Sequence, residues 1–112
     1  MDSIRIISTK ETYVPYISQK LREDLDPRIF QLTQEIKKRP LDTRKGMVNY
    51  AITRIILTCL KPETGWNYAS LSDARAVLSD ANDEMYRRLI APYEDGAIEK
   101  NGDLDEFKKD GE

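Results

Sequence analysis

The sequence predicts an all-α fold, a small helical bundle of four or five helices with a long central pair. Three observations predict it. Apolar residues recur every three or four positions, prolines and polar caps divide the chain into helix-length segments, and the 39% apolar share of 112 residues suffices for one modest core. The charged share of 34% exceeds the roughly 25% of an average protein, as expected for amphipathic helices with charged outer faces.

The two ends of the chain are expected to lie outside this bundle. Residues 1–13 are interpreted either as a short extended segment or as a disordered lead-in, because an isolated strand is not stable without a partner. Residues 14–102 are expected to form a single helical domain. Residues 103–112 are acidic and poor in apolar side chains, which predicts a disordered tail.

Prolines divide the first half of the domain. Ser18 suits the N-cap of a short helix, Gln19–Leu25, and Asp26-Pro27 suits the start of a second helix that Pro40 ends.

The next predicted helix runs from about Arg44 to Leu60 and is capped by Asp42 or Thr43. Its apolar residues cover most of its circumference, which predicts that it is the central helix of the bundle.

The second half begins with the loop Pro62–Tyr68, which carries the only Trp of the chain. A long helix is expected from Ala69 or Ser70 to Ala91. Pro92 would then restart a short helix that ends in a left-handed cap at Gly102.

Charge is segregated along the chain. Residues 20–61 carry ten Lys/Arg against five Asp/Glu, residues 62–102 carry four against eight, and residues 103–112 carry two against five. The halves are expected to pack against each other, or against the opposite half of another copy. Together with the apolar circumference of the central helix, this predicts a homo-oligomer.

Composition narrows the function classes. The chain has no His and one Cys, so His-dependent nucleophile systems, zinc clusters and an internal disulfide are excluded. No apolar run approaches the ~20 residues that span a bilayer. Glu94, Asp95 and Asp103 resemble a metal or acid–base set most closely, but are interpreted as compensating the dipole of the last helix. We therefore expect a cytoplasmic, non-enzymatic protein with no cofactor, no metal and no membrane partner.

Three runs resemble a known family: Pro15-Tyr16-Ile17, VNYAITRIIL at 48–57, and EMYRRLIAPYEDGAIEKNGD at 84–103. They are similar to the motifs of a small family of unknown function found in bacteriophages and their bacterial hosts. The resemblance covers about residues 14–103. It implies a phage context in a host or infected bacterium, and no particular activity. Ser79 departs from the family, in which a Glu is common at this place.

Polar residues within these runs are the candidate ligand-binding residues. Arginine binds phosphate bidentately and tyrosine can stack on a base, while Asn and Thr on an apolar helix need hydrogen-bond partners. The candidates are Asn49, Tyr50, Thr53, Arg54, Tyr86, Arg87, Arg88 and Tyr93. The alternative is structural: Asn49, Thr53 and Arg54 bond to neighbouring helices, and Glu84 forms a surface ion pair with Arg88 at i, i+4.

Two further clusters, one basic and one aromatic, stand out in the sequence. The basic run Lys37–Lys45 is interpreted as a solvated loop, because the connection is too long for a helix–turn–helix and a pI of about 5.3 argues against nucleic acid as a partner. Trp66 and Tyr68 mark either a contact surface or a lid over the core. The sequence thus predicts a phage-type binding protein, either a sponge that sequesters a nucleotide-derived host immune signal or an inhibitor or adaptor that binds a host protein.

Overall fold

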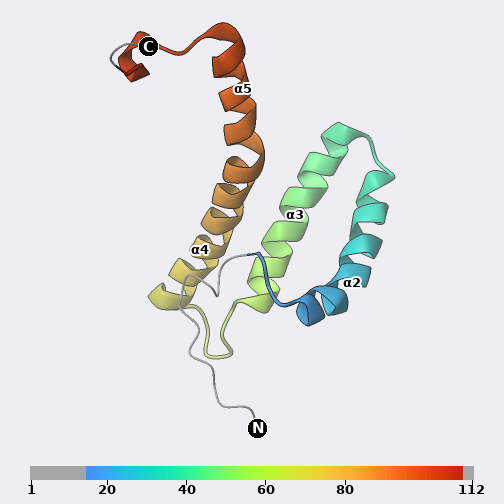
Figure 1. Cartoon of the computed structure of the whole chain (residues 1–112). Helices are drawn as coiled ribbons and strands as arrows, with labels where there is room; N and C mark the ends of the chain where they lie inside the picture. The colour runs from blue at the N-terminus through green and yellow to red at the C-terminus, as the bar shows by residue number, and fades with distance from the viewer. Residues whose placement is uncertain (1–14, 110–112) are drawn as a thin grey trace.

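The computed structural model describes residues 15–109, and this part of the chain is helical without any strand (Figure 1). Two helices form a hairpin, α2 (Gln19–Lys37) and α3 (Leu41–Cys59). The third helix is long and bent. It comprises α4 (Tyr68–Met85), the π-helical turn η1 (Tyr86–Ile90) and α5 (Ala91–Asn101), and a 3-10 turn, η2 (Asp105–Phe107), follows it. The all-α class is confirmed, whereas the predicted count of four or five helices is wrong.

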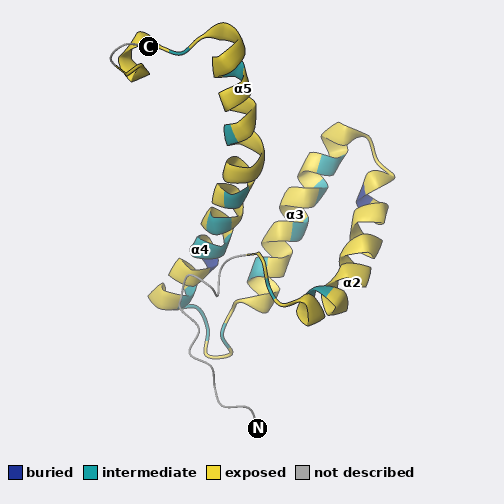
Figure 2. Ribbon diagram, viewed as in Figure 1, coloured by how far each residue is buried: buried dark blue, intermediate teal, exposed yellow. Residues whose placement is uncertain are grey.

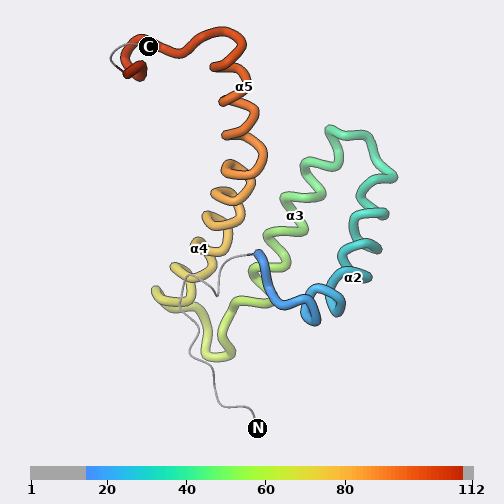
Figure 3. Tube along the Cα trace, viewed as in Figure 1, coloured from blue at the N-terminus to red at the C-terminus, as the bar shows by residue number. Residues whose placement is uncertain are grey.

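Helix α2 merges two of the predicted helices into one. Ser18 caps it as predicted, since its hydroxyl accepts the Leu21 N–H at 3.3 Å. Pro27, however, lies inside the helix rather than at the start of a new one. A proline removes one hydrogen bond and bends a helix without necessarily ending it, and Figure 3 shows the first turns of α2 at an angle to the rest.

The turn between α2 and α3 is held by an arginine. Pro40 is the N-cap of α3 and offers no side-chain cap, so the predicted caps Asp42 and Thr43 lie within the first turn instead. Arg44 reaches back and donates to the carbonyl oxygens of Arg39 at 2.6 Å and Lys37 at 2.9 Å. It thereby satisfies carbonyls that the end of α2 would leave unpaired.

The bent helix begins and ends on local signals. Asn67 and Ser70 form a reciprocal capping box, with bonds of 2.9 and 3.0 Å. Gly102 ends α5 at φ +91°, a conformation that favours glycine; the positive φ is as predicted, although ψ of 151° is outside the left-handed helical region.

Pro92 does not start a separate helix. The N–H of Ala91 bonds to the carbonyl of Tyr86, five residues back, and this wider turn continues the helix past a residue that has no N–H to donate.

The helices form two arms, the hairpin (α2 and α3) and the bent arm (α4, η1 and α5), which approach each other around the Trp66 loop (Figure 1). Only Ile36 and Ala74 are buried among residues 15–109, at 8% and 7% exposure, and α3 contains no buried residue (Figure 2). Within residues 15–109, α3 is therefore not the covered central helix that the sequence predicted. Helix α2 covers one side of α3, and α4 covers only its C-terminal part.

The predictions for the two ends lie largely outside these residues. The lead-in 1–13 is not described, nor is the end of the tail from residue 110.

Candidate functional site

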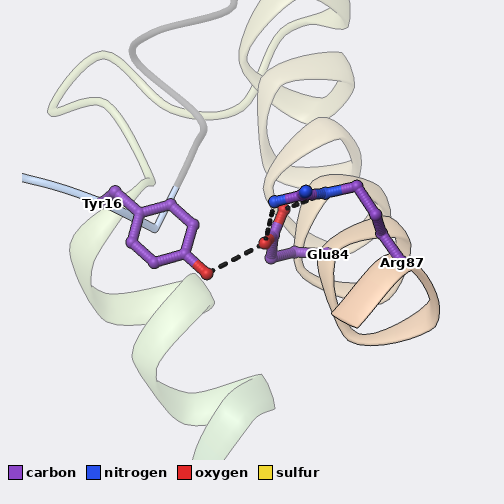
Figure 4. Close-up of polar contacts among 3 residues, drawn as sticks. All are labelled: Tyr16, Glu84 and Arg87. Carbon is purple, nitrogen blue, oxygen red and sulfur yellow. Dashed lines mark hydrogen bonds and ion pairs between the residues drawn. The ribbon is translucent and has the colours of Figure 1, made fainter. Parts of the chain in front are cut away.

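The best-defined polar contact joins the start of the described residues to the last turn of α4. Tyr16 donates its hydroxyl hydrogen to Glu84 Oε1 at 2.9 Å, and Arg87 donates to both carboxylate oxygens of Glu84, at 2.6 and 3.3 Å (Figure 4). We call these three residues the Tyr16 clasp. Arg22 lies over the Tyr16 ring, 5.7 Å from its centroid, a cation–π distance. The clasp attaches the start of α2 to the last turn of α4.

The clasp contains the shortest ion pair among the described residues, between Arg87 and Glu84. The Arg87 hydrogen bonds, and then the Tyr16 hydroxyl, hold the pKa of Glu84 below its usual range, while Glu84 raises the pKa of Arg87. The Glu84 side chain is 22% exposed against 63% for Arg87. The ion pair is with Arg87 at i+3 and not with Arg88 at i+4 as predicted. Because its charge is already paired, Arg87 is a weaker candidate for a free ligand than the sequence indicated.

The predicted site residues of α3 divide between two faces. Tyr50 and Arg54 line a hollow on the hairpin whose other walls are apolar, with Ile36, Met47 and Ile55 among them. Arg54 forms no ion pair with any residue between 15 and 109. An unpaired guanidinium and a phenol on an apolar hollow are suited to an anionic ligand with a flat apolar part.

Asn49 and Thr53 lie on the other side of α3. They line a smaller hollow that Leu78 of α4 helps to close. The Thr53 hydroxyl donates to the carbonyl of Asn49 at 2.9 Å. Thr53 therefore finds its partner within its own helix, rather than on a neighbouring helix as the structural alternative expected.

The residues predicted around η1 also have separate roles. Tyr86 donates to Glu94 at 3.0 Å, and this bond raises the pKa of the tyrosine. Tyr93 is 80% exposed, and Arg88 is exposed without an ion pair in the described chain. Glu94 is thus occupied by a hydrogen bond within the bent arm.

One chain does not bring the two groups of candidates together. The group on α3 belongs to the hairpin, while the group on η1 and α5 lies on the bent arm, where that arm continues away from the Trp66 loop (Figure 1). Helices α3 and α4 run in opposite directions from the Trp66 loop (Figure 1), and they meet around Leu78, so Arg54 shares no hollow with Arg87 or Arg88 in the described residues.

Sequence reasoning gave Tyr16 and Arg22 no role. Pro15-Tyr16-Ile17 stood out as a motif, but its partner is 68 residues away and no local spacing indicates it. The clasp joins the first and third of the three resembling runs.

Other possible sites are less developed. Residues 15–109 hold no group of three acidic or thiol side chains placed to bind a metal ion. No helix in the same range has the length and apolarity to cross a membrane. Trp66 is half-buried and lines a hollow with Ile56, Leu57 and Leu71, whereas Tyr68 on its rim is 87% exposed.

Comparison with known proteins identifies a family and no activity. No curated protein and no solved structure matches the chain. A family model described as a domain of unknown function, DUF6899, matches residues 14–104, which agrees with the span of the resembling runs. That match covers most of the chain, including both arms and the clasp, and the chain therefore belongs to the DUF6899 family.

Proposed function

We propose that this protein binds rather than catalyses, that it works as a homo-oligomer, and that its ligand is an anionic molecule of the nucleotide type. The observation that carries the proposal is the Tyr50–Arg54 hollow. It combines an unpaired guanidinium for a phosphate, a ring for a base and an apolar wall.

The exposed apolar surface supports the oligomeric part of the proposal. Ile52, Ile55 and Leu57 of α3 are 42%, 53% and 50% exposed, and such residues on a single helix are normally covered. A second copy that covers α3 would also bring its own Arg88 and Tyr93 near the first copy's hairpin. Ligand residues that are separate in one chain would then meet at a seam between chains.

The resemblance to phage proteins leads us to propose a biological role for this binding. A phage protein that holds a nucleotide-derived signal tightly, without consuming it, lowers the free concentration of that signal in the host. We propose this sponge role, in the cytoplasm of an infected bacterium, as the biological function. The buried seam of an oligomer favours tight sequestration because it encloses more of a small ligand than one open hairpin can.

A thermal-shift screen tests the ligand. We expect a cyclic dinucleotide or ADP-ribose to raise the melting temperature of the wild-type protein, since ligand at 100 times its Kd adds about 2.7 kcal/mol to the free energy of unfolding. Arg54→Ala should abolish the shift, and Arg88→Ala should reduce it. Arg87→Ala should act less, because Arg87 is paired with Glu84. Arg28→Ala is the matched control. Arg28 belongs to α2 but does not line the hollow, so this variant should keep the full shift.

Two results would contradict this proposal. If no nucleotide shifts the wild-type protein, the ligand class is wrong. If the shift persists in Arg54→Ala, the site is wrong even though the function stands.

A second candidate is an inhibitor or adaptor that binds a host protein. The observation that favours it is Tyr68, a highly exposed aromatic ring beside the half-buried Trp66. Exposed aromatic residues are enriched in protein interfaces. A host protein that is captured in stoichiometric amount by the wild type but not by Tyr68→Ala, with no nucleotide shift, would favour this function over the first.

A further inference from the structure

The hairpin carries a groove that is apolar along its floor and basic along its rim. The floor includes Leu41, Val48 and Ile52 of α3, and the rim includes Lys37 of α2 and Lys45 of α3. We call this the basic groove. Lys37 forms no ion pair within residues 15–109, and Lys45 lies 4.0 Å from a fully exposed Asp42, a weak contact. The groove therefore presents uncompensated positive charge beside uncovered apolar side chains.

Helix α5 has the complementary pattern. Ala91, Asp95 and Ile98 follow each other at i, i+4 and i+7 and so lie on one face, with Glu99 next to it. Ile98 is 43% exposed, and neither Asp95 nor Glu99 forms an ion pair in the described chain. Helix α5 thus carries two carboxylates without ion pairs beside an exposed apolar side chain.

The uncovered area matches what a second copy would bury. The chain exposes 10433 Å², whereas a folded monomer of 13.0 kDa is expected to expose about 6,300 Å². Even if residues 1–14 and 110–112 contributed as much as unfolded chain, about 2,800 Å², residues 15–109 would expose about 7,600 Å² against about 5,600 Å² expected for their mass. An excess of about 2,000 Å² per copy, counted over two copies, falls in the range of obligate dimers.

We propose that the basic groove of one copy binds helix α5 of a second copy. Ile98 would lie on the apolar floor, and Asp95 and Glu99 would face Lys37 and Lys45. With two-fold symmetry the same contact is made twice, so the pair closes without leaving a free groove or a free acidic helix. This inference specifies one interface of the proposed homo-oligomer, on the side of α3 away from the Tyr50–Arg54 hollow, and in that respect rests on the proposed function.

The occupant is a second copy because the chain's own α5 is directed elsewhere. The Tyr16 clasp and the Trp66 loop hold the first part of the bent arm at the hairpin, and α5 continues beyond them without contacting the groove in this structure (Figure 1). The opposite net charges of residues 20–61 and 62–102 favour such pairing between copies.

A charge exchange tests the seam with the full-length protein. The groove variant is Lys37→Glu/Lys45→Glu and the helix variant is Asp95→Lys/Glu99→Lys. Each variant alone pairs like charges, so we expect its self-association, measured by light scattering and analytical ultracentrifugation, to weaken by about tenfold or more. An equimolar mixture should restore association, because each acidic groove then meets a basic α5 and each basic groove meets an acidic one. The control is Lys20→Glu/Lys61→Glu, which changes net charge equally outside the groove and should associate like the wild type.

The outcomes separate this inference from the proposed function. The inference is overturned if either variant associates like the wild type, if the mixture fails to restore association, or if the wild type is a monomer, as closure by its own α5 would give. The nucleotide thermal shift is read independently. A shift without charge-exchange rescue leaves the ligand proposal standing alone, and rescue without a shift leaves the seam standing alone. Recovery in the mixture also shows that both variants fold.

Discussion

The hairpin and the bent arm differ in how much packing each region makes between its own helices. The hairpin has α2 and α3 packed side by side, Ile36 buried between them, and Arg44 closing the turn. Within residues 15–109, the bent arm is one continuous helix that packs on other helices near its start, at Ala74 and around the Trp66 loop, with the Tyr16 clasp farther along. The same chain therefore combines a pair of mutually packed helices with a long helix whose contacts with the other helices lie along α4 in the described residues.

This difference explains why α3 could be read as the centre of a bundle and yet has no buried residue. An apolar circumference shows that a helix must be covered, but not by which molecule. In a monomeric bundle, neighbouring helices would cover α3. Here α2 covers one side and α4 the C-terminal part, and the remaining apolar surface of α3 is exposed in the single chain.

The largest expected effect is on the hairpin. Ile36→Ala removes its only buried large side chain within residues 15–109 and should lower the free energy of unfolding by about 2–5 kcal/mol. Urea unfolding monitored by circular dichroism measures the loss. Ile29→Ala, at a position 50% exposed on the same helix, is the control and should cost clearly less. Equal losses of unfolding free energy would show that the burial of Ile36 between α2 and α3 does not stabilise the hairpin.

An intermediate effect is expected from two glycines of the bent arm. Gly102→Ala places a side chain at φ +91° and should destabilise the end of α5 by about 1 kcal/mol. Gly96→Ala lies in the middle of α5 with open space around it, so it should stabilise the helix by about 0.5–1 kcal/mol. Amide hydrogen exchange should show opposite changes in α5 for the two variants. Exchange in α2 and α3 should stay the same; a matching change there would mean that the two regions unfold as one.

The sequence predicted local features well and their assembly poorly. The Ser18 cap, the positive φ at Gly102 and the helical class all follow from neighbouring residues. Two proline positions were misread, because Pro27 bends a helix and Pro92 widens one, and neither ends it. In both cases flanking residues with strong helical patterns outweighed the proline.

In the candidate site, too, the sequence predicted contacts between residues one helical turn apart but not contacts between distant segments. Tyr50 and Arg54, one turn apart on α3, do share a hollow. The pairing of Glu84 with an arginine one turn ahead was also foreseeable, though the structure selects Arg87. The contribution of Tyr16 was not foreseeable, because it depends on where the first residues of the domain meet the end of α4.

The smallest expected effect tests the Tyr16 clasp, the hydrogen-bonded link between the residue before α2 and the bent arm. Glu84→Gln keeps the shape of the side chain and removes its charge, which weakens the bonds from Arg87 and Tyr16. The pKa of Glu84 is lowered in the folded protein, first by Arg87 and then by Tyr16. Its stabilising contribution is therefore complete above the ordinary glutamate pKa of about 4.3 and is lost as the pH falls through the lowered value.

The difference in unfolding free energy between wild type and Glu84→Gln should accordingly be largest near neutral pH and disappear in strong acid. Urea unfolding at a series of pH values measures it, with Glu63→Gln in the loop before α4 as the control that should show no such trend. The effect is small because Arg87 is largely exposed and water screens the pair. A difference that stayed constant from neutral to acidic pH would mean that the shape of Glu84, and not its charge, attaches the start of α2 to the bent arm.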